Sequence, residues 1–274
     1  MNRGLLALAR QLLSPAARKG TITQVSTSYA VAALTFDDGP HPEFTARLLR
    51  VLERHQARAT FFMVGEAASR QPDLVRRVAQ AGHAIGNHSW DHPSFPLLSR
   101  RERRKQLRDC QAALAPWGQR LFRPPFGHQT GASRFDAWCM GFEVVTWSIA
   151  SEDWLARDAQ WMVERVASEI KAGSVILFHD SLYALEETSN PDREPTLDAV
   201  NRLLELLSQR FRFVTLPELF ECGQAQREMW WQQGDLERLA RLREAGGEVW
   251  RHAPARMAGL GPTTDEKTLS RGKR

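Results

Sequence analysis

Cysteine and tyrosine are scarce in this sequence. Its 274 residues include three cysteines and two tyrosines. Cys110, Cys139 and Cys222 are far apart and belong to no paired motif. This pattern argues against a disulfide framework and indicates reduced thiols, as in cytoplasmic proteins. We therefore expect a cytoplasmic location.

Long apolar runs are also missing. No stretch approaches the roughly 20 apolar residues that a membrane-spanning helix needs, so no transmembrane segment is expected. The leucine-rich segment 1–17 is interrupted by Arg10, and no clear cleavage site follows it. We therefore expect no signal peptide. Helical spacing would make this segment weakly amphipathic, so that it either docks onto the domain or makes weak contact with a membrane surface.

The sequence has no strong excess of one charge, because its formal net charge is +5. One basic cluster stands out: Arg100, Arg101, Arg103, Arg104 and Lys105. We interpret this cluster as the solvated face of a helix and expect no nucleic-acid partner. With 42% hydrophobic and 25% charged residues, the composition is that of a globular protein.

Strand-like runs alternate with helical patterns along the chain. The expected strands are Ala30–Phe36, Ala59–Val64, Ala84–Asn87, Leu121–Arg123, Glu143–Trp147, Ser174–His179 and Phe211–Leu216. The expected helices are Glu43–His55, Pro72–Ala81, Ser99–Ala115, Ser133–Met140, Asp158–Ala172 and Thr196–Gln209. Seven strands alternating with helices predict an α/β protein with a parallel sheet, most simply a closed or nearly closed (β/α) barrel.

The same pattern suggests three regions. Residues 1–29 form an N-terminal extension, and residues 30–222 form the main domain. Residues 223–274 hold a charged C-terminal helix, Gln224–Ala245, followed by a partly disordered tail. Within the main domain, the loop Leu182–Pro195 follows a strand that carries candidate site residues, and it is either a lid or an inert surface excursion.

Two adjacent carboxylates, Asp37 and Asp38, end the first expected strand and are followed by Gly39-Pro40. Barrels of this class place their chemistry at the C-terminal ends of strands. Neighbouring strand residues point to opposite faces, so one carboxylate can bind a metal while the other handles a proton. Taken alone, the pair is equally consistent with a simple turn.

A pair of histidines supports the metal interpretation. His88 and His92 are four residues apart just past another expected strand. Together with Asp38 they give three protein ligands, which leaves room for water and substrate, as in a catalytic metal site. Nitrogen and oxygen ligands and a redox-free hydrolysis suit zinc, with cobalt, nickel or iron as alternatives.

Two further polar residues end strands. His179 follows a strongly apolar strand and is a candidate general acid. Arg123 precedes two prolines, and its guanidinium is placed to hold the Asp37 carboxylate and keep it ionised.

These segments resemble, in order and spacing, the five motifs of the NodB-homology polysaccharide deacetylases, which are family 4 carbohydrate esterases. The matching segments are Thr35–Pro40, His88–His92, Arg123–Gly127, Asp153-Trp154 and Leu177–His179. The resemblance runs from about Ala30 to Leu216. It implies a distorted (β/α) barrel for residues 30–222 and the metal-dependent removal of N-acetyl groups from sugars.

The resemblance also implies roles. Asp37 would be the catalytic base, His179 the general acid and Arg123 the residue that orients the base. Asp153 would support Arg123. The metal ligands would be Asp38, His88 and His92.

Three more residues would contact the substrate. The backbone N–H of Phe126 would help to stabilise the oxyanion, and Trp154 and Leu177 would line the acetyl pocket. The chain departs from the family pattern at Ala150, where an acid usually stands three residues before Asp153. We expect this departure to bear on the shape or polarity of the groove, and hence on which substrate fits, and to leave the metal ligands and the acid/base pair intact.

We therefore expect a hydrolase that removes N-acetyl groups from an amino sugar in a chito-oligosaccharide, a peptidoglycan precursor or a surface polysaccharide, and releases acetate. The alternatives are hydrolysis of another linear amide or a cyclic imide on the same scaffold, and a non-catalytic carbohydrate-binding relative. A glycosidase fits less well, because its two carboxylates must be roughly 5 Å or more apart across a sugar ring.

Overall fold

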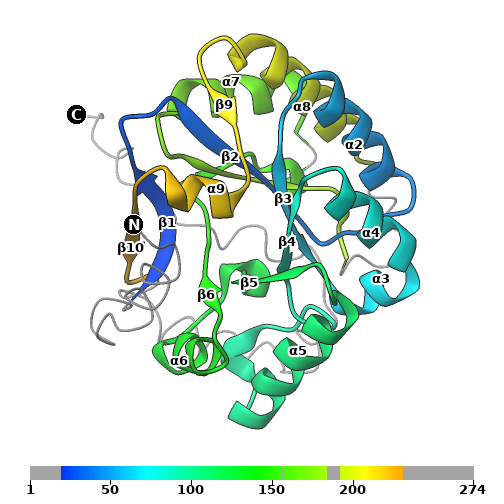
Figure 1. Ribbon diagram of the computed structural model, residues 1–274, viewed down its shortest axis with the longest axis vertical. Coiled ribbons are helices and arrows are strands. Elements are labelled where there is room, and N and C mark those ends of the chain that lie inside the picture. The colour runs from blue at the N-terminus through cyan, green and yellow to red at the C-terminus, as the bar shows by residue number, and fades with distance from the viewer. Residues whose placement is uncertain (1–19, 156, 184–191, 231–274) are drawn as a thin grey trace, which may run out of the picture.

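Seven parallel strands form the centre of the molecule in the computed structural model, which describes residues 20–155, 157–183 and 192–230. Their order in space is β6-β5-β4-β3-β2-β8-β7, and the short β9 pairs with the start of β2. The seven strands are β2 (Val31–Asp37), β3 (Ala59–Met63), β4 (Ala84–Asn87), β5 (Gly118–Phe122), β6 (Glu143–Val144), β7 (Ile149–Ala150) and β8 (Val175–His179), and the eighth strand of the sheet is β9 (Arg212–Phe213). The predicted distorted (β/α) barrel is confirmed (Figure 1).

Most helices lie around the outside of these strands, and α9 lies further inward, near β1 and β10 (Figure 1). The helices are α2 (Phe44–Arg54), α3 (Gly65–Arg70), α4 (Pro72–Gln80), α5 (Arg100–Ala113), α6 (Gly131–Cys139), α7 (Ala159–Glu169), α8 (Glu194–Leu207) and α9 (Leu216–Glu221). Three 3-10 turns, η2 (Phe95–Leu97), η3 (Pro125–Gly127) and η4 (Asp153–Leu155), lie in the connections. The sequence did not predict α3, which is only six residues long.

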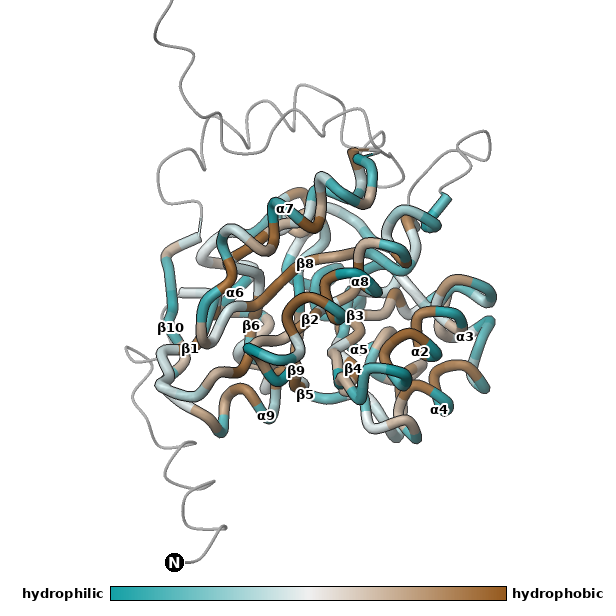
Figure 2. Tube along the Cα trace, turned by 90° about the horizontal axis from the view of Figure 1, so that it is seen from above, coloured by the Kyte–Doolittle hydropathy of each residue, from teal (hydrophilic) through white to brown (hydrophobic). Residues whose placement is uncertain are grey.

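The main core lies between the sheet and the helices that cover it. Phe36, Phe61 and Phe178 pack together across β2, β3 and β8, with ring centroids 5.3 and 6.0 Å apart for the two pairs that involve Phe36. Figure 2 shows hydrophobic residues along β2 and β8 and hydrophilic ones on the outward turns of the helices. Burying the central strands from both sides requires the continuous apolar runs that identified them. This rigid centre fixes the strand ends that carry the site.

An antiparallel pair of strands closes one side of the barrel. Strands β1 (Thr21–Ser26) and β10 (Gln224–Glu228) pair with each other at the left of Figure 1. Strand β1 also bridges to Val145 after β6 and to Ser174 before β8, so it spans the open side between the two ends of the strand order. The helix expected to begin at Gln224 is therefore wrong over Gln224–Glu228, where the backbone pairs with β1 instead.

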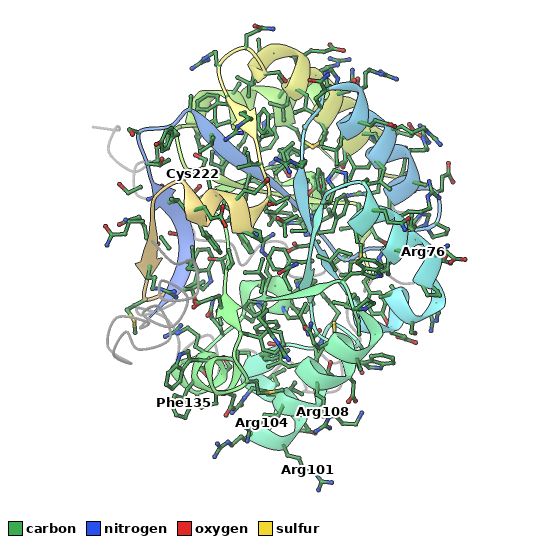
Figure 3. All side chains as sticks on the ribbon, viewed as in Figure 1. Arg76, Arg101, Arg104, Arg108, Phe135 and Cys222 are labelled. Carbon is green, nitrogen blue, oxygen red and sulfur yellow. The ribbon has the colours of Figure 1, made fainter. Side chains whose placement is uncertain are left out.

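Three further expectations concern the basic cluster, the cysteines and membrane-spanning segments. The basic cluster lies on α5, where Figure 3 shows Arg101 and Arg104 extending away from the helix, as expected for a solvated face. The expectation is wrong for Arg103, which is buried and pairs with Asp136 on α6. All three cysteines are free. None of the helices in the described residues has the length and apolarity to cross a bilayer.

Some expectations fall outside the described residues. These are the N-terminal segment 1–17, most of the loop between Leu182 and Pro195, and the C-terminal stretch beyond Trp230. The cytoplasmic location also stays a prediction.

Candidate active site

The two carboxylates at the C-terminal end of strand β2 differ in backbone conformation. Asp37 is the last residue of the strand and lies beside His179, its register partner on β8. Asp38 has left the strand and adopts a left-handed backbone with φ of 76°. This uncommon conformation for a residue other than glycine is typical of functional sites. As a result, Asp37 meets Arg123 while Asp38 meets His92, and His88 lies between the two carboxylates.

Arg123 holds Asp37. Its Nη1 donates to Asp37 Oδ1 at 2.7 Å and to the Thr35 hydroxyl at 2.8 Å. Its other nitrogens donate to the carbonyl oxygens of Val145 and Thr146. The guanidinium is fully buried, and burial lowers its pKa while the Asp37 charge partly restores it. The predicted pairing of Arg123 with Asp37 is present in the structure.

The three predicted metal ligands converge. One ligand atom from each of Asp38, His88 and His92 lies within 4.8 Å of the other two. His88 and His92 reach Asp38 Oδ1 with their Nε2 atoms, at 3.3 and 3.1 Å. His88 Nδ1–H donates to the Arg123 carbonyl oxygen at 2.7 Å, so in the neutral ring Nε2 carries the lone pair.

This donor set fits a divalent cation. Asp38 Oδ1 is buried and accepts no hydrogen bond from the described residues. Burial raises the pKa of Asp38, but His92 and His88 outweigh it and hold the pKa well below its usual range. A buried carboxylate oxygen that meets two imidazole nitrogens at 3.3 and 3.1 Å offers the three donor atoms that a divalent cation would bind. One oxygen and two nitrogens are ligands that zinc accepts readily.

His179 pairs with Asp153 rather than standing alone. Its Nδ1–H donates to Asp153 Oδ1 at 2.7 Å, and its backbone N–H donates to Oδ2 at 2.8 Å. Burial alone would lower the pKa of His179, but the Asp153 charge dominates and raises it to about 9. The expected support of Arg123 by Asp153 is therefore wrong. The partners of the Arg123 guanidinium are Asp37, Thr35 and two carbonyl groups, because Asp153 is committed to His179.

The three predicted substrate-contacting residues surround the same strand ends. Phe126 has φ of 57°, and its ring meets the edge of His92 with centroids 4.5 Å apart. Trp154, in η4, packs edge-on against His179 with centroids 5.4 Å apart. Leu177 is buried in β8, two residues before His179 and therefore on the same face of the strand. Their roles toward the substrate stay predictions.

Ala150 lies in β7, paired with Leu177. Its carbonyl oxygen accepts a 3.4 Å hydrogen bond from Arg165 Nε, and the nearby Glu152 lies 3.9 Å from Arg165 Nη2. The methyl group therefore stands next to the expected acetyl-pocket strand, where the family usually has an acid. The effect of Ala150 on the groove stays a prediction.

The structure also brings in residues that the sequence did not suggest. The Tyr183 backbone N–H donates to Asp38 Oδ2 at 3.0 Å, and the Tyr183 hydroxyl bonds to Glu66 on α3. Arg193 and Thr196 approach Asp153 from the start of α8. These contacts join segments that are far apart in the sequence, and nothing in the local sequence pattern points to them.

Asp180 supports the turn that carries the two carboxylates. Its side chain is buried, accepts a hydrogen bond from Thr45, and has a pKa that burial raises to about 7. A Cβ atom at Gly39 would lie 2.3 and 2.5 Å from the Asp180 carboxylate oxygens. Glycine at position 39 is therefore required by close packing.

Replacing Gly39 with alanine should destabilise the protein by about 1–3 kcal/mol, because the short Asp180 side chain cannot move away freely. It should also weaken metal binding, since Asp38 is the adjacent residue. Chemical unfolding and zinc titration measure the two effects. Gly131→Ala is the matched control, because nothing lies within 4 Å of a Cβ atom there; equal effects of both substitutions would contradict the packing argument.

Comparison with known proteins agrees with this geometry. The family model described as polysaccharide deacetylase matches residues 24–145. A peptidoglycan-N-acetylglucosamine deacetylase of Bacillus cereus is 35% identical over 198 residues, which cover 71% of this chain and 70% of the relative. A chitooligosaccharide deacetylase of Sinorhizobium fredii is 33% identical over 206 residues, 72% of this chain and 95% of the relative.

A solved structure shows the same architecture. The family 4 carbohydrate esterase from Streptomyces lividans, in complex with acetate, superimposes with a TM-score of 0.62 at 31% identity. The match covers 74% of this chain and 99% of that one. With these matches and the convergence of the predicted motif residues, the chain belongs to the polysaccharide deacetylase family.

Proposed function

We propose that this protein removes N-acetyl groups from amino sugars of an oligo- or polysaccharide and releases acetate, with zinc held by Asp38, His88 and His92. One observation carries the proposal: the three ligand atoms converge between a carboxylate fixed by an arginine and a histidine fixed by an aspartate. The relatives named for peptidoglycan N-acetylglucosamine and for chitooligosaccharides support an N-acetylated sugar as substrate.

The protein side chains divide the proton transfers between them. When bound, zinc would polarise the acetamide carbonyl and make the attacking water more acidic. Asp37 accepts the proton of that water; Arg123 occupies Oδ1, and Oδ2 lies on the side of His88, 3.8 Å from Nε2. His179 uses Nδ1 to bind Asp153, so its Nε2–H is left to protonate the leaving amine. The products are acetate and a free amino sugar.

The pKa of His179 sets an upper pH limit for activity. Because this pKa is raised to about 9, the ring stays protonated below that pH and loses its proton as the pH rises through it. A cation at Asp38 offsets part of the negative charge near the ring, so the limit should lie lower in the zinc-loaded enzyme than in the metal-free protein. The pH dependence of kcat/KM and an NMR titration of the metal-free protein measure the two values. A metal-free value near 6.5, that of an unperturbed histidine, would contradict the assigned pairing.

Acetate release from N-acetylglucosamine oligomers tests the function directly. The purified protein is stripped of metal, assayed, and assayed again after reloading with zinc or cobalt. We expect no release from the stripped protein and recovery on reloading. Absence of release from protein shown to contain metal would contradict this substrate and direct attention to Ala150.

A further inference from the structure

Arg193 is a buried cation beside the proposed acid. It is 6% exposed and directly precedes α8. Its Nη1 lies 3.7 Å from Asp153 Oδ2 and 3.3 Å from the Asp153 carbonyl oxygen. Both contacts are to one residue, the partner of His179. A charged side chain is rarely buried without a paired charge, so the placement of Arg193 is tied to Asp153.

The Asp153 carboxylate is held from several directions. Oδ1 accepts from His179 Nδ1, and Oδ2 accepts from the His179 backbone N–H and from the Thr196 hydroxyl at 3.3 Å. Arg193 approaches the Oδ2 side. The carboxylate therefore cannot rotate without losing contacts to β8 and α8, and Oδ1 stays directed at the imidazole. A fixed Oδ1 in turn fixes the ring orientation that aims Nε2 at the substrate.

Arg193 also fixes the segment that carries Trp154. Its bond to the Asp153 carbonyl oxygen ties η4 to the start of α8. Trp154 follows Asp153 directly and packs against His179. One guanidinium thus touches both the carboxylate that orients the acid and the backbone that places the neighbouring aromatic ring.

Arg193 also contributes to the charge balance around Asp153. Asp153 is fully buried, and burial alone raises its pKa, but the charges of His179 and Arg193 outweigh burial and lower it. Three other carboxylates, those of Asp37, Asp38 and Asp180, lie in the same region. A second cation therefore helps Asp153 to remain an ionised acceptor even when His179 has given up its proton.

We propose that Arg193 is a positioning residue that locks the Asp153–His179 pair in its reactive orientation. The proposal rests on the proposed deacetylase function for its catalytic consequence, and on geometry alone for its structural one. Arg193 acts through Asp153 and is therefore distinct from the residues that contact the reacting atoms.

The test compares Arg193→Met and Arg193→Lys with the wild type. In Arg193→Met we expect kcat to fall by about 10–100-fold, the range for loss of an outer hydrogen-bond partner, with KM within about twofold and zinc content unchanged. The downfield Nδ1–H proton resonance of His179, which reports its bond to Asp153, should broaden or disappear. Arg193→Lys keeps the charge and should restore part of kcat and the resonance.

Arg103→Met is the matched control. Arg103 is also buried, and its Nε donates to the buried Asp136 at 2.8 Å, but this pair joins α5 to α6 away from the acid. This substitution should lower thermal stability without moving kcat per folded molecule or the His179 resonance. The proposal is overturned if Arg193→Met keeps both kcat and the resonance, or if it behaves as Arg103→Met does. The resonance needs no substrate, so it decides the structural claim even if the wild type fails to release acetate.

Discussion

Replacing Asp37 with asparagine should lower kcat by about 10²–10⁴-fold, the usual contribution of a general base. The amide has nearly the same shape but cannot accept the proton of the attacking water. The asparagine still offers an oxygen to Arg123 Nη1. In the wild-type protein this nitrogen lies 2.7 Å from Asp37 Oδ1. Steady-state acetate release from an N-acetylglucosamine oligomer gives the measurement.

Zinc binding should survive the same change, because Asp38, His88 and His92 are untouched. Stability should fall, since the buried Arg123 loses its anionic partner. Zinc content and thermal unfolding of the Asp37→Asn protein therefore serve as internal controls. Turnover within about tenfold of the wild type, below the range for a general base, would refute the assignment of Asp37 as the base.

Replacing Asp38 with alanine should abolish stable zinc binding, and acetate release with it. Loss of a direct ligand should exceed the roughly 10–100-fold effect of losing an outer partner. The two histidine Nε2 atoms alone provide fewer ligands than the three that catalytic zinc sites use. Zinc titration followed by calorimetry measures the affinity independently of activity.

Asp91 provides the control for this prediction. It lies between His88 and His92 in sequence, but its Oδ1 accepts from Gln106 Nε2 at 2.6 Å instead of joining the ligand atoms. Asp91→Asn should therefore bind zinc as the wild type does. If Asp38→Ala bound zinc as tightly as Asp91→Asn, the metal site would have to be placed elsewhere.

The fold was predictable because its central strands are buried on both faces. Ala84–Asn87 was predicted with the observed bounds, and Ala59–Val64 exceeded β3 by one residue. The strand ends were predictable for the same reason, since polar residues such as Asp37 and His179 interrupt apolar runs. Motif spacing then grouped these ends into one site, and the structure confirms the convergence of the metal ligands.

Pairings between distant segments were not predictable in this way. The sequence assigned Asp153 to Arg123, but in the structure Asp153 pairs with His179. Arg123 and His179 are both polar residues at strand ends, and the order of residues in the sequence does not say which of the two an aspartate contacts. Strand β10 is polar, and its partner β1 lies about 200 residues earlier in the sequence. Its local pattern therefore predicted a helix. Arg193 follows a loop, where no periodicity marks a side chain as buried.

The pairing of β1 with β10 places the first and last strands of the described residues side by side. Thr21 and Glu228 are cross-strand partners, and adjacent strands lie about 4.8 Å apart. A short linker could therefore join the two strands in a circularly permuted gene, with new termini at the exposed turn around Gly141. Such a rearrangement would translate the Asp153–His179 half before the metal-ligand half, yet the same strand neighbours would assemble.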